Sequence, residues 1–102
     1  MSDNILVTLK KLQLKYNTLG FLIIGVFGSQ ARGDANQESD IDILYDIDKK
    51  FLRKFSGWNA ITQIEEIKKE MQDSLNLTVD LASIDNNSTT FQKSVRKEIV
   101  YV

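Results

Sequence analysis

The chain has 102 residues and a formal net charge of −1, so no general electrostatic field would gather nucleic acid or an anionic membrane. It contains no Cys and no His, which excludes disulfides, zinc–thiolate sites, thiol nucleophiles and the commonest general base. Any catalysis must therefore use carboxylates, hydroxyls, Lys, Arg or a hard metal ion. Asp is in excess, with 9 of the 14 acidic residues.

Length and hydropathy favour one small domain outside the membrane. A chain of 102 residues suits a single domain, expected over residues 1–102. The longest apolar run, residues 21–27, is far shorter than the roughly 18 residues that a membrane-spanning helix needs. This run also lies inside the chain, unlike a signal sequence. We therefore expect a cytoplasmic protein with no membrane association.

The first half of the chain predicts a helix and two strands. Apolar residues recur at helical spacing over residues 4–18, with Asp3 or Asn4 as the expected cap. Residues 21–27 form a continuous β-branched and aromatic run, typical of a strand buried on both faces. A polar loop or short helical turn follows, and residues 40–45 predict the second strand.

The second half predicts a helix, a strand, a helix and a short closing strand. Residues 50–75 carry an apolar stripe at helical spacing, and residues 77–82 alternate as a strand does. The last helix is expected to begin at Asn87 or Ser88, and residues 100–102 can leave it as a short strand. This order predicts an α/β (α+β) fold, with a small mixed sheet flanked by helices.

Within the long helical segment, Gly57 and Trp58 need separate treatment. Gly57 is a candidate break that would divide the segment into two helices. Trp58 continues the apolar stripe and is expected in the core, with a partner-binding face as the alternative.

The first candidate site is Gly28-Ser29, at the end of the first expected strand. Glycine lets the backbone approach a ligand closely, and exposed amides at the start of a helical turn bind phosphate. The serine hydroxyl adds a donor. By itself the pair is more often an ordinary turn.

The second candidate site is Asp40-Ile41-Asp42, with Asp80 as a third acid. Residues i and i+2 of a strand point the same way, roughly 6.5–7 Å apart, so both carboxylates can bind hard divalent cations together with nucleotide phosphates. Asp80 lies in the middle of the third strand, where Asp is rare. It is either an edge-strand residue in water or a third carboxylate that faces the first two.

Together these features resemble the signature of the DNA polymerase β-like nucleotidyltransferase superfamily. The likeness is greatest to its minimal nucleotidyltransferases, which are stand-alone domains of about this length. It covers essentially the whole chain in element order, and the motif itself falls within residues 25–46. Two segments carry it: Gly28-Ser29-Gln30-Ala31-Arg32-Gly33 and Ser39-Asp40-Ile41-Asp42-Ile43.

The resemblance implies a polymerase β-like nucleotidyltransferase fold and nucleotidyl transfer with two Mg²⁺ ions. Asp40 and Asp42 would hold the ions, which orient the triphosphate leaving group and activate an acceptor hydroxyl. Asp80 would complete the second ion's ligand set or take the proton, with Asp85 as the alternative third carboxylate. The residues implied to bind ATP or another nucleoside triphosphate are Gly28, Ser29, Arg32, Gly33 and Ser39.

The acceptor is expected on another molecule, because the chain has no room for a domain that would hold it. Minimal family members are often encoded beside a helical HEPN-type toxin, which they modify with AMP as the antitoxin. The resemblance therefore implies a tyrosine of a HEPN-type partner as acceptor. A homodimer is a second expected assembly. Direct nucleic-acid binding is not expected, since the Lys clusters are scattered and offset by acids.

A non-catalytic nucleotide-binding or partner-binding subunit that keeps the fold is the alternative function. The intact Asp pair favours catalysis, since a retired site is free to lose a carboxylate. Asp46 and Asp48 extend the acidic pattern, but a calcium loop would need a Gly and a distal Glu that are missing here. We place both residues after the second strand, in the turn before the next helix.

Overall fold

The computed structural model describes residues 2–33, 40–85 and 89–102. The predicted α+β class is confirmed, with helices packed on a four-stranded mixed sheet. The described elements are α1 (Asp3–Asn17), β1 (Phe21–Phe27), α2 (Ser29–Arg32), β2 (Ile41–Ile47), α3 (Lys49–Lys54), α4 (Trp58–Leu75), β3 (Val79–Ser83), α5 (Thr89–Glu98) and β4 (Val100–Tyr101).

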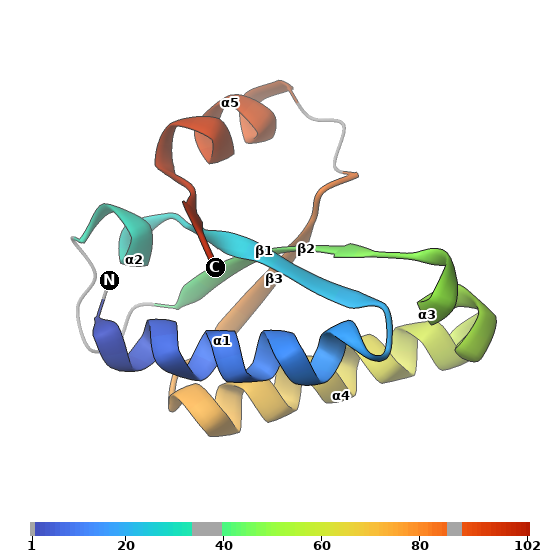
Figure 1. The fold of residues 1–102 in the computed structure, drawn as a ribbon. Coiled ribbons are helices and arrows are strands. Elements are labelled where there is room, and N and C mark those ends of the chain that lie inside the picture. The colour runs from blue at the N-terminus through green and yellow to red at the C-terminus, as the bar shows by residue number, and fades with distance from the viewer. Residues whose placement is uncertain (1, 34–39, 86–88) are drawn as a thin grey trace.

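The sheet has the strand order β3-β2-β1-β4. β1 runs antiparallel to both β2 and β4, whereas β2 and β3 are parallel. A parallel pair needs a crossover connection, which α3 and α4 provide. Helices α1 and α4 lie side by side on one face of the sheet, and α5 lies on the other (Figure 1).

The core lies between the sheet and the pair α1 and α4. The alternation of β2 sends Ile41 and Ile43 into this core, and both are fully buried. The same alternation sends Asp42 to the opposite face, toward α5. The buried cluster consists of Leu9, Leu12, Tyr16, Phe21, Ile23, Val26, Ile41, Ile43, Phe51, Ile67, Met71 and Val79.

Two helix caps differ from the expectations. Ser2 caps α1, because its hydroxyl accepts a hydrogen bond from the Ile5 amide at 3.3 Å. Asp3 and Asn4 lie inside the first turn instead, where the charge of Asp3 favours the helix dipole. The cap expected for α5, at Asn87 or Ser88, lies outside the described residues.

The prediction that Asp46 and Asp48 both lie in the turn after the second strand is only half correct. Asp46 lies inside β2, which continues to Ile47, so the expected turn begins two residues later than predicted. Asp48 does precede a helix, and its carboxylate accepts a hydrogen bond from the Phe51 amide at 3.2 Å as the N-cap of α3.

The division at Gly57 is confirmed, since α3 ends at Lys54 and α4 begins at Trp58. The expectation of a core position for Trp58 is wrong. Trp58 is 82% exposed and Ile61 is 53% exposed. Both lie on the exposed side of the first turns of α4, whereas Ala60 and Ile64 of the same turns pack against the core. Periodicity identifies an apolar face, but not how much of it is covered.

Among the described residues, no helix combines the length and apolar character needed to cross a membrane.

Candidate active site

The sheet brings Asp42 and Asp80 together. In the parallel pairing of β2 with β3, Asp42 lies directly opposite Asp80. Paired residues of adjacent strands point to the same face, so both carboxylates lie on the face that carries α5. β3 is also an edge strand, and Asp80 is exposed. Both descriptions of Asp80 therefore hold: it is an edge residue and it neighbours the Asp pair.

The Gly-Ser turn lies at the same end of the sheet. Phe27, the last residue of β1, pairs with Asp42, and Gly28 follows it. Gly28 has φ +74°, and a Cβ on it would lie 2.2 Å from Oδ2 of Asp42. The Asp42 carboxylate therefore packs against the Cα of Gly28, and a side chain at this position would displace it.

The short helix α2 fixes the remaining residues of the motif. Gly33 ends α2 with φ +84°, and its amide donates to the Ser29 carbonyl at 3.0 Å. A Cβ at Gly33 would meet no atom of the described residues within 4 Å, and the left-handed backbone favours glycine there. Ser39 lies outside the described residues.

A fourth acid, Glu98, joins the cluster, and the sequence prediction missed it. Its Oε2 accepts a hydrogen bond from the Gly28 amide at 3.2 Å. Its Oε1 pairs with Nη1 of Arg32 at 2.9 Å. Glu98 is the last residue of α5, and 70 residues separate it from Gly28. No local pattern marks it; only the packing of α5 onto the sheet brings it here.

Like charges crowd the Asp42 carboxylate. Partial burial raises its pKa above the ordinary value, and the charges of Asp80 and Asp40 raise it further. Glu98 acts in the same direction, whereas the Arg32 guanidinium opposes the shift. Electrostatic repulsion at the Asp42 carboxylate therefore destabilises the folded chain, and a bound cation would relieve it.

The donor set suits a hard divalent cation. Asp40, Asp42 and Asp80 offer carboxylate oxygens, which Mg²⁺ prefers. Within the part of the chain that the structure describes, no three acidic side chains already converge as a finished metal site. The carboxylates would have to rotate toward a shared ion, which the exposure of Asp40 and Asp80 permits.

Asp85, the alternative third carboxylate, lies elsewhere. It follows the far end of β3, where the amide of Ile84 donates to the Tyr45 carbonyl at 2.9 Å. Burial raises the pKa of Tyr45, and the charge of Asp85 adds to this shift. The geometry thus places Asp80, and not Asp85, beside Asp42.

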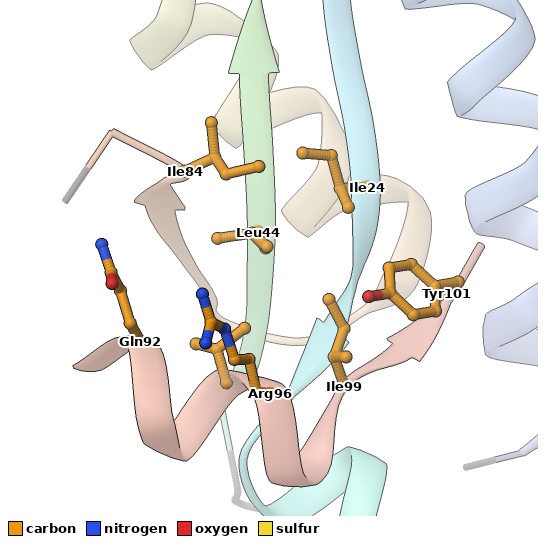
Figure 2. Close-up of a pocket in the computed structure, with 8 residues that line it drawn as sticks. Ile24, Leu44, Ile84, Gln92, Arg96, Ile99 and Tyr101 are labelled. Carbon is orange, nitrogen blue, oxygen red and sulfur yellow. The ribbon is translucent and has the colours of Figure 1, made fainter. Parts of the chain in front are cut away.

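A cavity of about 270 Å³ opens on the same face of the sheet. Figure 2 shows Gln92 and Arg96 of α5, and Ile99 directly after this helix, lining the cavity together with Ile24 and Leu44 of the sheet. Helix α5 therefore presents different residues to two places: Glu98 contacts Gly28 and Arg32, whereas Arg96 lines the cavity. No local sequence pattern predicts this cavity, because it forms only when α5 packs over the strands.

Comparison with known proteins finds relatives in both sequence and fold. The family profile described as "Polymerase beta, Nucleotidyltransferase" matches residues 8–102. The chain is 33% identical over 97 residues to the protein adenylyltransferase MntA of Thermococcus cleftensis. The alignment covers 95% of this chain and 89% of the relative.

Two solved structures share the fold. One is described as a minimal nucleotidyltransferase, with a TM-score of 0.69, 22% identity, and coverage of 91% of this chain and 87% of that chain. The other is a toxin–antitoxin complex with AMP-PNP, with a TM-score of 0.68, 23% identity, and coverage of 98% of this chain and 72% of that chain.

Proposed function

Because the chain belongs to the polymerase beta nucleotidyltransferase family, it is a nucleotidyltransferase, and we propose that it transfers AMP from ATP to a hydroxyl group of a partner protein with the help of Mg²⁺. The observation that carries the proposal is the register of β2 and β3, which sets Asp80 opposite Asp42 beside the Gly28 turn. Similarity to a protein adenylyltransferase supports AMP as the transferred group.

In this proposal Asp40, Asp42 and Asp80 hold Mg²⁺, which supplies charge neutralisation of the triphosphate and activation of the acceptor hydroxyl. The chain's own donors position the substrate. Phosphate oxygens accept hydrogen bonds from the Gly28 amide, the Ser29 hydroxyl and the Arg32 guanidinium. Such hydrogen bonds are strong because the phosphate is charged. Gly33 fixes the turn of α2, and Ser39 is proposed as a further contact.

The transfer is an in-line displacement at the α-phosphorus. A bond forms from the acceptor oxygen to phosphorus, the bond to the bridging oxygen breaks, and pyrophosphate leaves. The hydroxyl proton passes to Asp80 or to water. No His or Cys is needed, which agrees with a chain that contains neither.

The proposed acceptor is a tyrosine of a HEPN-type toxin, so the protein would act as an antitoxin. The fold shared with the toxin–antitoxin complex supports a toxin as the partner, while the HEPN class and the tyrosine rest on the family resemblance. Trp58 and Ile61 add exposed apolar surface on which a toxin or a second copy of the chain can pack. A single domain over residues 1–102 and a cytoplasmic location, where ATP is available, belong to the same proposal.

Label transfer from α-labelled ATP tests the proposal. The chain is incubated with Mg²⁺ and the purified product of the neighbouring gene, and mass spectrometry locates the modified residue. The wild type is compared with Asp40→Asn/Asp42→Asn and with Asp73→Asn, which removes an exposed carboxylate on α4.

We expect labelled partner with the wild type and with Asp73→Asn, and none with Asp40→Asn/Asp42→Asn or after chelation of Mg²⁺. Equal labelling by the double variant would make the carboxylates dispensable. No label with the wild type would favour a non-catalytic binding subunit.

A further inference from the structure

Glu98 occupies two of the groups that are proposed to bind phosphate. Its carboxylate accepts from the Gly28 amide at 3.2 Å and from Nη1 of Arg32 at 2.9 Å. A carboxylate and a phosphate offer the same feature to such donors, a pair of anionic oxygens. The side chain of Glu98 therefore lies where a phosphate group would bind.

The two contacts differ in whether they can be shared. Arg32 carries five N–H donors and can hold Glu98 and a phosphate together. The Gly28 amide has a single proton, which Glu98 already accepts. A phosphate oxygen can bind this amide only after the Glu98 oxygen has left it.

The backbone below Glu98 is fixed, but its side chain is not enclosed. Val95, one turn earlier in α5, is buried, and β4 pairs with β1 directly after the helix. The Val102 amide donates to the Ile24 carbonyl at 3.1 Å, which ties down the end of the chain. The Glu98 side chain itself retains 25% exposure. It can rotate into solvent without any movement of α5.

We infer that Glu98 is an internal competitor for the phosphate site: it holds the Gly28 amide and Arg32 in the free protein and must rotate away before the triphosphate binds. This inference rests on the proposed function, because it takes the Gly28 turn as the phosphate site. It assigns Glu98 a role in nucleotide affinity, separate from the three Asp residues.

Calorimetry with two ligands tests the competition. Binding of ATP and of tripolyphosphate, which has no base or ribose, is measured in Mg²⁺ for the wild type, Glu98→Gln and Glu98→Asp. The first variant removes the charge, and the second keeps it on a side chain too short to reach both donors. Glu65→Gln, at an exposed position on α4, controls for the loss of one charge. Thermal melts establish that every variant is folded.

We expect both Glu98 variants to bind both ligands about three- to tenfold more tightly, because a site that is occupied most of the time weakens apparent affinity in proportion. Glu65→Gln should bind like the wild type. Unchanged or weaker binding by both Glu98 variants would overturn the inference. Tighter binding by Glu98→Gln alone would also overturn it, since that result indicates a general repulsion and not occupancy of the donors.

The proposed function can fail separately. If the wild type binds ATP but labels no partner, adenylyl transfer is refuted while the affinity series still decides the role of Glu98. If neither ligand binds to the wild type or to any variant, both proposals fall.

Discussion

Glu70 and Asp42 are carboxylates in two side-chain clusters with opposite surroundings, the first with Lys15 and Tyr16 and the second with other acids. Glu70, on α4, accepts hydrogen bonds from Lys15 at 2.7 Å and from the Tyr16 hydroxyl, and these hydrogen bonds lower its pKa. Asp42, on β2, is half buried beside other carboxylates, and its pKa is raised. Glu70 forms an ion pair with Lys15, which links α4 to α1. The negative charge around Asp42 is not neutralised in this way. An excess of negative charge is what a site that binds a metal ion and a nucleotide requires.

Short of removing the Asp42 carboxylate itself, the largest expected effect comes from crowding it with one methyl group. Gly28→Ala places a Cβ where Oδ2 of Asp42 lies, and it also strains a backbone at φ +74°. Displacement of Asp42 by about 1 Å should reduce label transfer roughly 100-fold. Gly57→Ala is the matched control, since it has φ +57° and its added Cβ would meet no described atom within 4 Å.

Both glycine variants should lose about 1–3 kcal/mol of stability, measured by denaturant unfolding, because their positive φ with strongly negative ψ is a backbone conformation nearly restricted to glycine. Only Gly28→Ala should lose activity beyond this. Equal activity of the two variants would contradict the contact between Gly28 and Asp42 as a requirement of the site.

Removing the charge of Asp42 should stabilise the fold. Asp42→Asn relieves the repulsion and is expected to raise the free energy of unfolding by up to about 1 kcal/mol, a value limited by solvent screening at this half-exposed group. Mg²⁺ should raise the melting temperature of the wild type and leave that of Asp42→Asn unchanged, because only the wild type offers the full carboxylate set. A variant that melts below the wild type without Mg²⁺ would count against crowding.

Removing either partner from the Glu70 cluster should do the reverse. Glu70→Gln and Tyr16→Phe are each expected to destabilise the fold by about 0.5–1 kcal/mol, since one exposed ion pair and one hydrogen bond contribute at this level. A double-mutant cycle by denaturant unfolding measures the coupling between them. Nucleotide affinity should not change in either variant. A change would contradict the claim that the Glu70 cluster takes no part in nucleotide binding.

The smallest effect is the dependence of these differences on pH. The pKa of Glu70 is lowered on folding, so its stabilisation is present at neutral pH and is lost as pH falls through that lowered value. The pKa of Asp42 is raised, so its penalty appears only as pH rises above the ordinary Asp range. Unfolding free energies at pH 7 and about pH 3 should show both variants converging on the wild type, from opposite sides.

The sequence predicted those parts of the site that depend on local pattern. Continuous apolar residues marked β1, and alternation marked β2 with its two Asp residues. The role of Asp80 stayed open at that stage, because it depends on which strands are neighbours and in what register. The pairing of Asp42 with Asp80 settles their adjacency, while their binding of metal is a proposal.

Features that depend on tertiary packing were not predictable in this way. Glu98 reaches Gly28 only because α5 packs on the sheet, and a lone Glu in a helix carries no local signal. Trp58 has the spacing of a core residue, but its side chain stays exposed while Ala60 of the same turn packs against the core. Ser2 caps α1 where Asp3 and Asn4 were equally good candidates by residue type.

The most direct test of the contrast between the clusters is label transfer from α-labelled ATP by three proteins assayed together: the wild type, Asp42→Asn and Glu70→Gln. We predict that Glu70→Gln transfers label within about twofold of the wild type, and that Asp42→Asn loses transfer by at least ~100-fold despite its greater stability. Comparable transfer by Asp42→Asn, or equal loss in both variants, would contradict the assignment of the crowded carboxylates as the active site.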